Sequence, residues 1–169
     1  MPKKFLKRFI PKTETLKAHP HLRHFGETLH NPNLWHLNRR SAAGAVAVGL
    51  FCAWIPLPFQ MLLAATIAIF FSVNLPISVA LVWISNPLTM GPLFYGAYRL
   101  GAFLLHLPVQ HFHFELSYSW LRATFGTIAP PLFLGSILLG SASAFLGYLL
   151  FRAFWRFAII KKWQRRNKK

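Results

Sequence analysis

Residues 41–98, SAAGAVAVGLFCAWIPLPFQMLLAATIAIFFSVNLPISVALVWISNPLTMGPLFYGAY, contain no charged side chain. As a helix this run would extend roughly 87 Å at about 1.5 Å per residue, nearly three times a hydrocarbon core of about 30 Å. A soluble domain of this size would not bury so long an apolar run. The sequence therefore predicts an all-α, polytopic membrane protein. Prolines within the run predict broken or re-entrant helices, with structural breaks at Pro56, Pro58, Pro76 and Pro87.

Basic residues are concentrated at the two ends of the chain. There are 19 Lys and Arg against three Glu, which gives a formal net charge of +16. Nine of the basic residues precede Ser41 and eight follow Leu149. Because positively charged flanks stay in the cytoplasm, we expect both termini there and an even number of membrane crossings. Nucleic acid is not an expected partner, since the basic residues flank apolar segments instead of forming a stripe on a soluble face.

Three regions are expected along the chain. Residues 1–40 form a basic cytoplasmic segment with amphipathic helices, residues 41–155 form the membrane domain, and residues 156–169 form a basic cytoplasmic tail. Residues 128–151 are the cleanest span, uncharged and with Pro130 and Pro131 near the start. Two arrangements of residues 42–105 stay open. They form three full helices, or a re-entrant hairpin turning at residues 56–58 followed by one broken crossing.

Two interruptions of the uncharged run resemble each other. Residues 54–61 (WIPLPFQM) align with residues 83–90 (WISNPLTM) at an offset of 29, with Trp, Ile, Pro and Met identical. Paired interruptions point to a binding site, because non-helical backbone at membrane depth must be satisfied by protein or by a watery cavity. Ordinary kinks, surface turns and capping of broken helix ends are the alternatives. Four of the predicted ligand-binding residues lie at or beside breaks in the uncharged run: Gln60, Asn74, Asn86 and Thr89. The other two, Tyr98 and Arg99, lie in the apolar segment that follows.

Arg99 is the sharpest of these candidates. It follows Tyr95 and Tyr98 in an apolar segment, where a guanidinium must face a cavity, find a partner or extend to the interface. The chain has only three carboxylate side chains, so an anionic headgroup or a phosphate is the expected partner. Simple extension of the side chain to the interface is the alternative.

Catalysis, metal binding and a cofactor are not expected. The chain has no Asp and three Glu, so paired carboxylates for acid and base chemistry and a Ser-His-Asp triad cannot be assembled. Eight histidines are present, but no cysteine or carboxylate cluster supports a metal site among them. We therefore expect a protein that is not an enzyme.

Several strings resemble one known family. They are NRRS at 38–41, IPLPFQM at 55–61, NLP at 74–76, NPLT at 86–89 and AYRLG at 97–101. In combination they are similar to the uncharacterised bacterial membrane family catalogued as domain of unknown function 2062. The resemblance implies a small protein of the bacterial inner membrane, and it brings no established activity, ligand or catalytic residue.

These features predict a protein that binds or translocates an anionic lipid or another small amphiphile, with membrane lipids as its partners. The alternative is a non-transporting adaptor or structural protein. Such a protein would bind a membrane protein, or a second copy of itself, through its basic tails and a stripe of small residues. The stripe recurs every fourth residue at Ser136, Gly140 and Ala144. Close packing within the chain is the other use of that stripe.

Overall fold

The computed structural model describes residues 31–108 and 118–166. All regular structure in these two ranges is helical, which confirms the all-α prediction. The amphipathic helices predicted within residues 1–30 lie outside the described residues. The helices are α3 (Pro32–Trp35), α4 (Arg39–Ala53), α5 (Gln60–Phe70), α6 (Leu75–Val82), α7 (Met90–Leu104) and α8 (Tyr118–Arg166).

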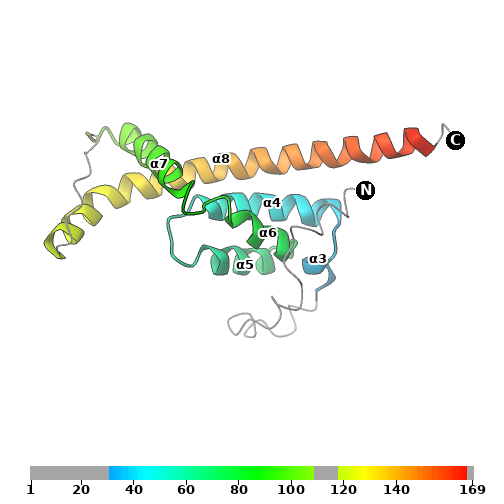
Figure 1. The fold of residues 1–169 in the computed structure, drawn as a ribbon, viewed down its shortest axis with the longest axis horizontal. Coiled ribbons are helices and arrows are strands. Elements are labelled where there is room, and N and C mark those ends of the chain that lie inside the picture. The colour runs from blue at the N-terminus through cyan, green and yellow to red at the C-terminus, as the bar shows by residue number, and fades with distance from the viewer. Residues whose placement is uncertain (1–30, 109–117, 167–169) are drawn as a thin grey trace.

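The long helix α8 lies along a small layer made of α4, α5 and α6 (Figure 1). α4 packs directly on α8, and α5 and α6 lie on the side of α4 away from α8. α7 leaves the end of this layer and crosses α8. Since α4, α5, α6 and α7 have 15, 11, 8 and 15 residues, none reaches the roughly 20 residues of a full crossing. Residues 42–105 therefore do not form three helices long enough to cross the membrane.

Asparagine side chains begin both α4 and α6. Asn38 Oδ1 accepts a hydrogen bond from the Ser41 N–H at 2.7 Å, and Asn74 Oδ1 accepts one from the Ile77 N–H at 3.2 Å. Each bond satisfies a donor that the first turn of a helix leaves without a partner. Pro76 lies in the first turn of α6, where a missing N–H is harmless. It therefore stands at the start of a helix, after the turn that follows α5.

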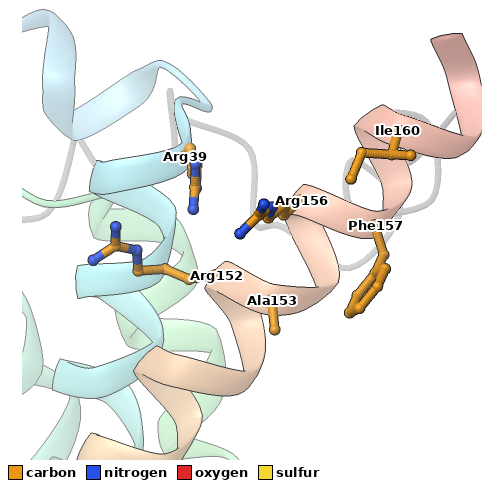
Figure 2. Close-up of a pocket in the computed structure, with 6 residues that line it drawn as sticks. All are labelled: Arg39, Arg152, Ala153, Arg156, Phe157 and Ile160. Carbon is orange, nitrogen blue, oxygen red and sulfur yellow. The ribbon is translucent and has the colours of Figure 1, made fainter.

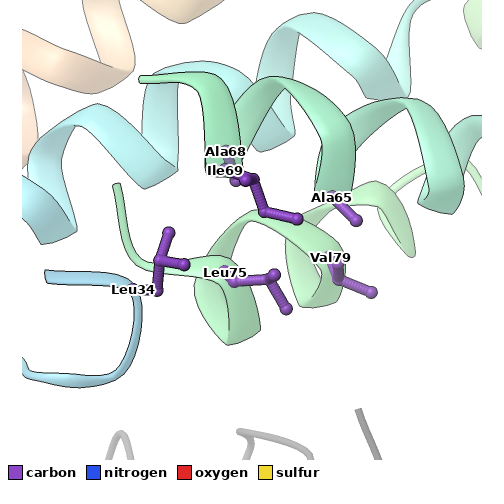
Figure 3. Close-up of a cluster of buried hydrophobic side chains, with 6 residues drawn as sticks. All are labelled: Leu34, Ala65, Ala68, Ile69, Leu75 and Val79. Carbon is purple, nitrogen blue, oxygen red and sulfur yellow. The ribbon is translucent and has the colours of Figure 1, made fainter. Parts of the chain in front are cut away.

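Small residues bring α4, α5 and α6 close together. Leu34 and Leu75 pack with α5 and α6 side chains in one fully buried cluster, completed by Ala65, Ala68, Ile69 and Val79 (Figure 3). Between α4 and α6, a Cβ on Gly49 would lie 2.7 Å from the Ser78 carbonyl oxygen. The Ser78 hydroxyl also lies 3.3 Å from the Ala45 carbonyl oxygen of α4. The layer is thus held by close backbone contact as well as by apolar packing.

α8 contains the predicted span of residues 128–151 and extends beyond it at both ends. It is one helix of 49 residues, with Pro130 and Pro131 inside it, and it runs through the predicted boundary at residue 155. Each proline removes one N–H from the helical ladder, but neighbouring helices make prolines tolerable within long apolar helices. Among the described residues, Gly126–Ile160 is the one stretch long and apolar enough to cross a membrane. Only 17% of its most apolar window is buried, which is less than the core helix of a soluble domain buries.

The small residues of α8 are used inside the chain. A Cβ on Gly135 would lie 1.8 Å from the Ala97 carbonyl oxygen of α7, and a Cβ on Gly101 would lie 1.8 Å from the Pro131 carbonyl oxygen. Further along α8, Gly140 abuts the Phe51 backbone of α4. The helices cross at backbone contact, as small residues allow in membrane proteins. Internal packing is therefore the observed use of this part of the stripe.

Candidate functional site

The two interruptions predicted by the sequence meet at one end of the layer. α4 ends at Ala53 and α6 ends at Val82, which are 29 residues apart, the same offset as the sequence repeat. The Ser85 hydroxyl of the second interruption lies 2.9 Å from Gln60 Oε1, and both side chains are buried. The Gln60 amide nitrogen donates to the Ile55 carbonyl oxygen of the first interruption. Gln60 therefore ties the two interruptions together.

The second interruption satisfies its own polar groups. Asn86 Oδ1 accepts from the N–H groups of Leu88 at 2.9 Å and Thr89 at 3.1 Å. The Thr89 hydroxyl donates to the Ile84 carbonyl oxygen and lies 3.1 Å from the Asn86 N–H. These bonds make a compact turn in which the polar side chains form hydrogen bonds with backbone groups. Asn86 and Thr89 thus act in the structure as capping groups for the break around Pro87.

The outer surface of this end is apolar. Leu88 is 88% exposed and Phe59 is 73% exposed. Other large apolar side chains at the same two interruptions are exposed as well: Leu57, Trp83 and Ile84. Loops that face water carry polar side chains, whereas here the polar atoms turn inward and the apolar ones outward. We call this end of the layer, residues 54–60 and 83–89, the uncharged end.

The six predicted ligand-binding residues occupy separate places. Gln60, Asn86 and Thr89 are at the uncharged end. Asn74 caps the opposite end of α6, with its amide nitrogen 3.5 Å from the His36 carbonyl oxygen. Tyr98 is buried in α7, and its neighbour Arg99 is exposed with its guanidinium 6.0 Å from the centre of the Tyr95 ring. The structure therefore does not gather the six side chains around one cavity.

A pocket of about 480 Å³ lies between the start of α4 and the later part of α8. All six residues that line it are exposed, so it is an open depression in the surface and not an enclosed cavity. Figure 2 shows Arg39 reaching from the first turn of α4 and Arg156 reaching from α8 toward it, with Arg152 one turn earlier on α8. We call these three residues the arginine cluster. The remaining lining residues are Ala153, Phe157 and Ile160.

The arginine cluster has no carboxylate partner within the described residues. All three glutamates, Glu14, Glu27 and Glu115, lie outside those residues. Arg39 is the first residue of α4, where the partial positive charge of the helix dipole opposes another cation. Arg152 is oriented by Tyr148, whose hydroxyl oxygen lies 3.2 Å from Arg152 Nη1. Arg39, Arg152 and Arg156 are all exposed, and three guanidinium groups that line one pocket attract an anion.

Apolar side chains complete the pocket. Phe157 and Ile160 are exposed on α8 beside Arg156 (Figure 2). A ligand with an anionic head and an apolar tail could place its head at the guanidinium groups and its tail on these side chains. Sequence reasoning assigned these arginines only to the basic flanks of the membrane domain. The spacing of Arg152 and Arg156 already places them on one helix face, but their proximity to Arg39 is a long-range property of the fold.

Comparisons with known proteins identify the family. Neither a curated protein nor a solved structure matches the chain. The model of a family described as "Uncharacterized protein conserved in bacteria (DUF2062)" matches residues 22–164, which include the layer, α7, the arginine cluster and nearly all of α8. Because the match covers most of the sequence, the chain belongs to the DUF2062 family of bacterial proteins.

Proposed function

We propose that this chain is a non-enzymatic protein of the bacterial inner membrane that binds an anionic lipid or another small anionic amphiphile. The pocket between α4 and α8 is the binding site, and the arginine cluster holds the anionic head. The single observation that carries the proposal is that Arg39, Arg152 and Arg156, from two helices, line one pocket with exposed apolar side chains beside it. Binding is the first step of any translocation of such a ligand.

The charge distribution supports one placement in the membrane. With Arg152 at the headgroup level, about 20 residues of α8 toward its N-terminus reach the opposite side, near Leu132. α4 begins at Arg39 beside this level and is roughly 22 Å long, so its far end reaches the hydrocarbon without crossing it. The uncharged end then lies in the lipid as the tip of a re-entrant hairpin. The positive-inside rule places the arginine cluster and both termini in the cytoplasm.

The chemistry of the cluster suits a phosphate or carboxylate head. Guanidinium groups stay charged at every physiological pH and donate paired hydrogen bonds to two oxygens of one anion. Each bond to a charged partner is worth about 1.5–3 kcal/mol. A headgroup beside three such donors is held far more firmly than one attracted only by the general field of a basic tail, which salt screens.

A lipid titration tests the proposal. Full-length protein in a nonionic detergent is titrated with fluorescent phosphatidylglycerol, and phosphatidylcholine with the same tails serves as the neutral comparison. We expect Arg39→Gln and Arg156→Gln each to weaken phosphatidylglycerol binding about tenfold. Arg40→Gln is the matched control, because it removes the same charge beside Arg39 from a residue that does not line the pocket.

Two results would contradict the proposal. One is equal binding of phosphatidylcholine and phosphatidylglycerol by the unchanged protein. The other is equal loss of binding in Arg40→Gln and Arg39→Gln, because that result would assign the attraction to net charge. Circular dichroism of each variant separates loss of the site from loss of the fold.

The adaptor alternative has weaker support. It uses the small-residue stripe of α8 as a face for a partner, but Gly140 abuts α4 and Ser136 is fully buried within the chain. A second copy or another membrane protein could not reach Gly140 without displacing α4. An adaptor role would have to use a different surface, such as the basic tails.

A further inference from the structure

We infer that the ligand's head is a phosphomonoester, with three terminal oxygens, and not a phosphodiester such as that of the common glycerophospholipids. The inference rests on the proposed function and narrows the class of ligand. It is carried by the composition of the pocket: three guanidinium groups, no carboxylate among its lining residues, and apolar side chains on one side.

The number of donors is the first reason. A phosphodiester has two terminal oxygens, whereas a phosphomonoester has three. Arg39 lines the pocket from α4 and Arg156 from α8, and Arg152 lines it from one turn earlier on α8 with its Nη1 3.2 Å from the Tyr148 hydroxyl oxygen (Figure 2). Each guanidinium can donate two hydrogen bonds to one anion. Three terminal oxygens offer more acceptor positions than two to donors that reach the pocket from two helices.

The charge of the site is the second reason. The three guanidinium groups carry three positive charges, and the start of α4 adds the partial positive charge of a helix dipole. A diester brings one negative charge, whereas a monoester brings up to two at neutral pH. Since none of the six lining residues is acidic, the doubly charged head compensates the site better.

The ligand itself provides a pH signature. A phosphomonoester gains its second negative charge as pH rises through a second pKa of about 6, whereas a phosphodiester keeps one charge throughout this range. Other described charged or titratable groups near this end are Arg40 at the start of α4, Tyr148 against Arg152, and His36 before α4. His36 is the histidine among them, so His36→Gln is the control for a contribution of the protein itself to the pH dependence.

The test compares phosphatidic acid with phosphatidylglycerol, using the same acyl chains and the full-length protein in nonionic detergent at pH 5 and pH 8. We expect phosphatidic acid to bind about tenfold more tightly at pH 8 and within about threefold at pH 5. Cardiolipin, which has two charges on two diesters, should bind no better per phosphate than phosphatidylglycerol. The preference should survive His36→Gln and disappear in Arg156→Gln.

The outcomes separate this inference from the proposed function. Equal binding of phosphatidic acid and phosphatidylglycerol at pH 8, with both dependent on Arg156, would overturn the monoester and leave the anionic-amphiphile site intact. Cardiolipin equal to phosphatidic acid, or a pH dependence lost in His36→Gln, would also overturn it. Inorganic phosphate tests whether the apolar tail contributes to binding. If it competed as strongly as phosphatidic acid, the inference that the ligand is an amphiphile would be wrong. Failure of all anionic lipids would overturn the proposed function.

Discussion

The two ends of the α4–α6 layer differ in the partners of their polar side chains. At the uncharged end, Gln60 and Asn86 are hydrogen-bonded to backbone and side-chain groups of the same two interruptions, and the outer surface is apolar. At the other end, Arg39, Arg152 and Arg156 line one pocket, and no acidic side chain lines it among the described residues. Polar side chains that already have protein partners stabilise the breaks. Charged side chains with no acidic neighbour in the described part of the chain favour binding of an anion from outside it.

The largest effect is expected from a charge placed at the uncharged end. Leu88 is the most exposed large apolar residue of the uncharged end. If this surface faced water, Leu88→Asp would barely change the free energy of unfolding. In hydrocarbon we expect it to lower the free energy of unfolding by about 2.5–3.5 kcal/mol. Thermal unfolding in lipid nanodiscs measures the change.

Asn33→Asp is the control for that experiment. Asn33 is exposed at the opposite end of the layer, and an aspartate there keeps the oxygen that accepts from Asn38. We expect its stability to change by less than about 0.5 kcal/mol. If Leu88→Asp left the free energy of unfolding unchanged, the claim that the uncharged end faces lipid and the other end faces water would be wrong.

The next effect concerns Gln60. Gln60→Ala leaves the Ile55 carbonyl and the Ser85 hydroxyl without the amide that joins the two interruptions. We expect a loss of about 1–3 kcal/mol in the free energy of unfolding, because two hydrogen bonds worth about 0.5–1.5 kcal/mol each disappear. The Ser85 hydroxyl keeps the Val82 carbonyl oxygen, and the Ile55 carbonyl keeps the Leu57 N–H. Anionic-lipid binding should stay within about twofold of the unchanged protein, since Gln60 lies at the end away from the arginine cluster.

Thr66→Ala is the matched variant for Gln60→Ala. The Thr66 hydroxyl bonds only to the Leu62 carbonyl oxygen of its own helix among the described residues, and the substitution should cost less than about 0.5 kcal/mol. If Gln60→Ala abolished lipid binding while the protein stayed folded, Gln60 would be a ligand-binding residue, as the sequence alone predicts. The two ends would then share one function.

The smallest effect is expected at Arg99. The sequence predicts it to hold an anion, but the structure places its side chain on the exposed surface of α7 beside Tyr95. We expect Arg99→Gln to change phosphatidylglycerol affinity by less than about twofold, against about tenfold for Arg156→Gln. The same fluorescent-lipid titration measures both. A loss at Arg99 equal to that at Arg156 would move the anionic site to α7.

Local chemistry made much of the fold predictable. An uncharged run rich in apolar residues predicts helices, and Pro56, Pro58 and Pro87 coincide with the places where helices are interrupted. The repeated octapeptide also anticipates two helices that end 29 residues apart. Pro130 and Pro131 were harder to interpret, because α8 continues through them against α7. A proline breaks a helix only where nothing around it compensates for the lost hydrogen bond.

The candidate site was less predictable than the fold. Unpaired amides are costly in an apolar segment, so the sequence predicts that polar residues beside the breaks bind a ligand. In the structure, Gln60 and Asn86 instead hydrogen-bond to backbone groups of the chain itself. The arginine cluster joins Arg39 to two residues more than a hundred positions later. No local pattern encodes this contact, because it depends on α4 and α8 packing side by side.

A structure of the protein in nanodiscs that contain an anionic lipid tests the central claim most directly. We expect a headgroup in the pocket between α4 and α8, with its oxygens in hydrogen-bond contact with Arg39, Arg152 and Arg156 and its tail against Phe157 and Ile160. An empty pocket with the three guanidinium groups turned into the solvent would contradict the claim, as would a headgroup bound at Arg99 instead.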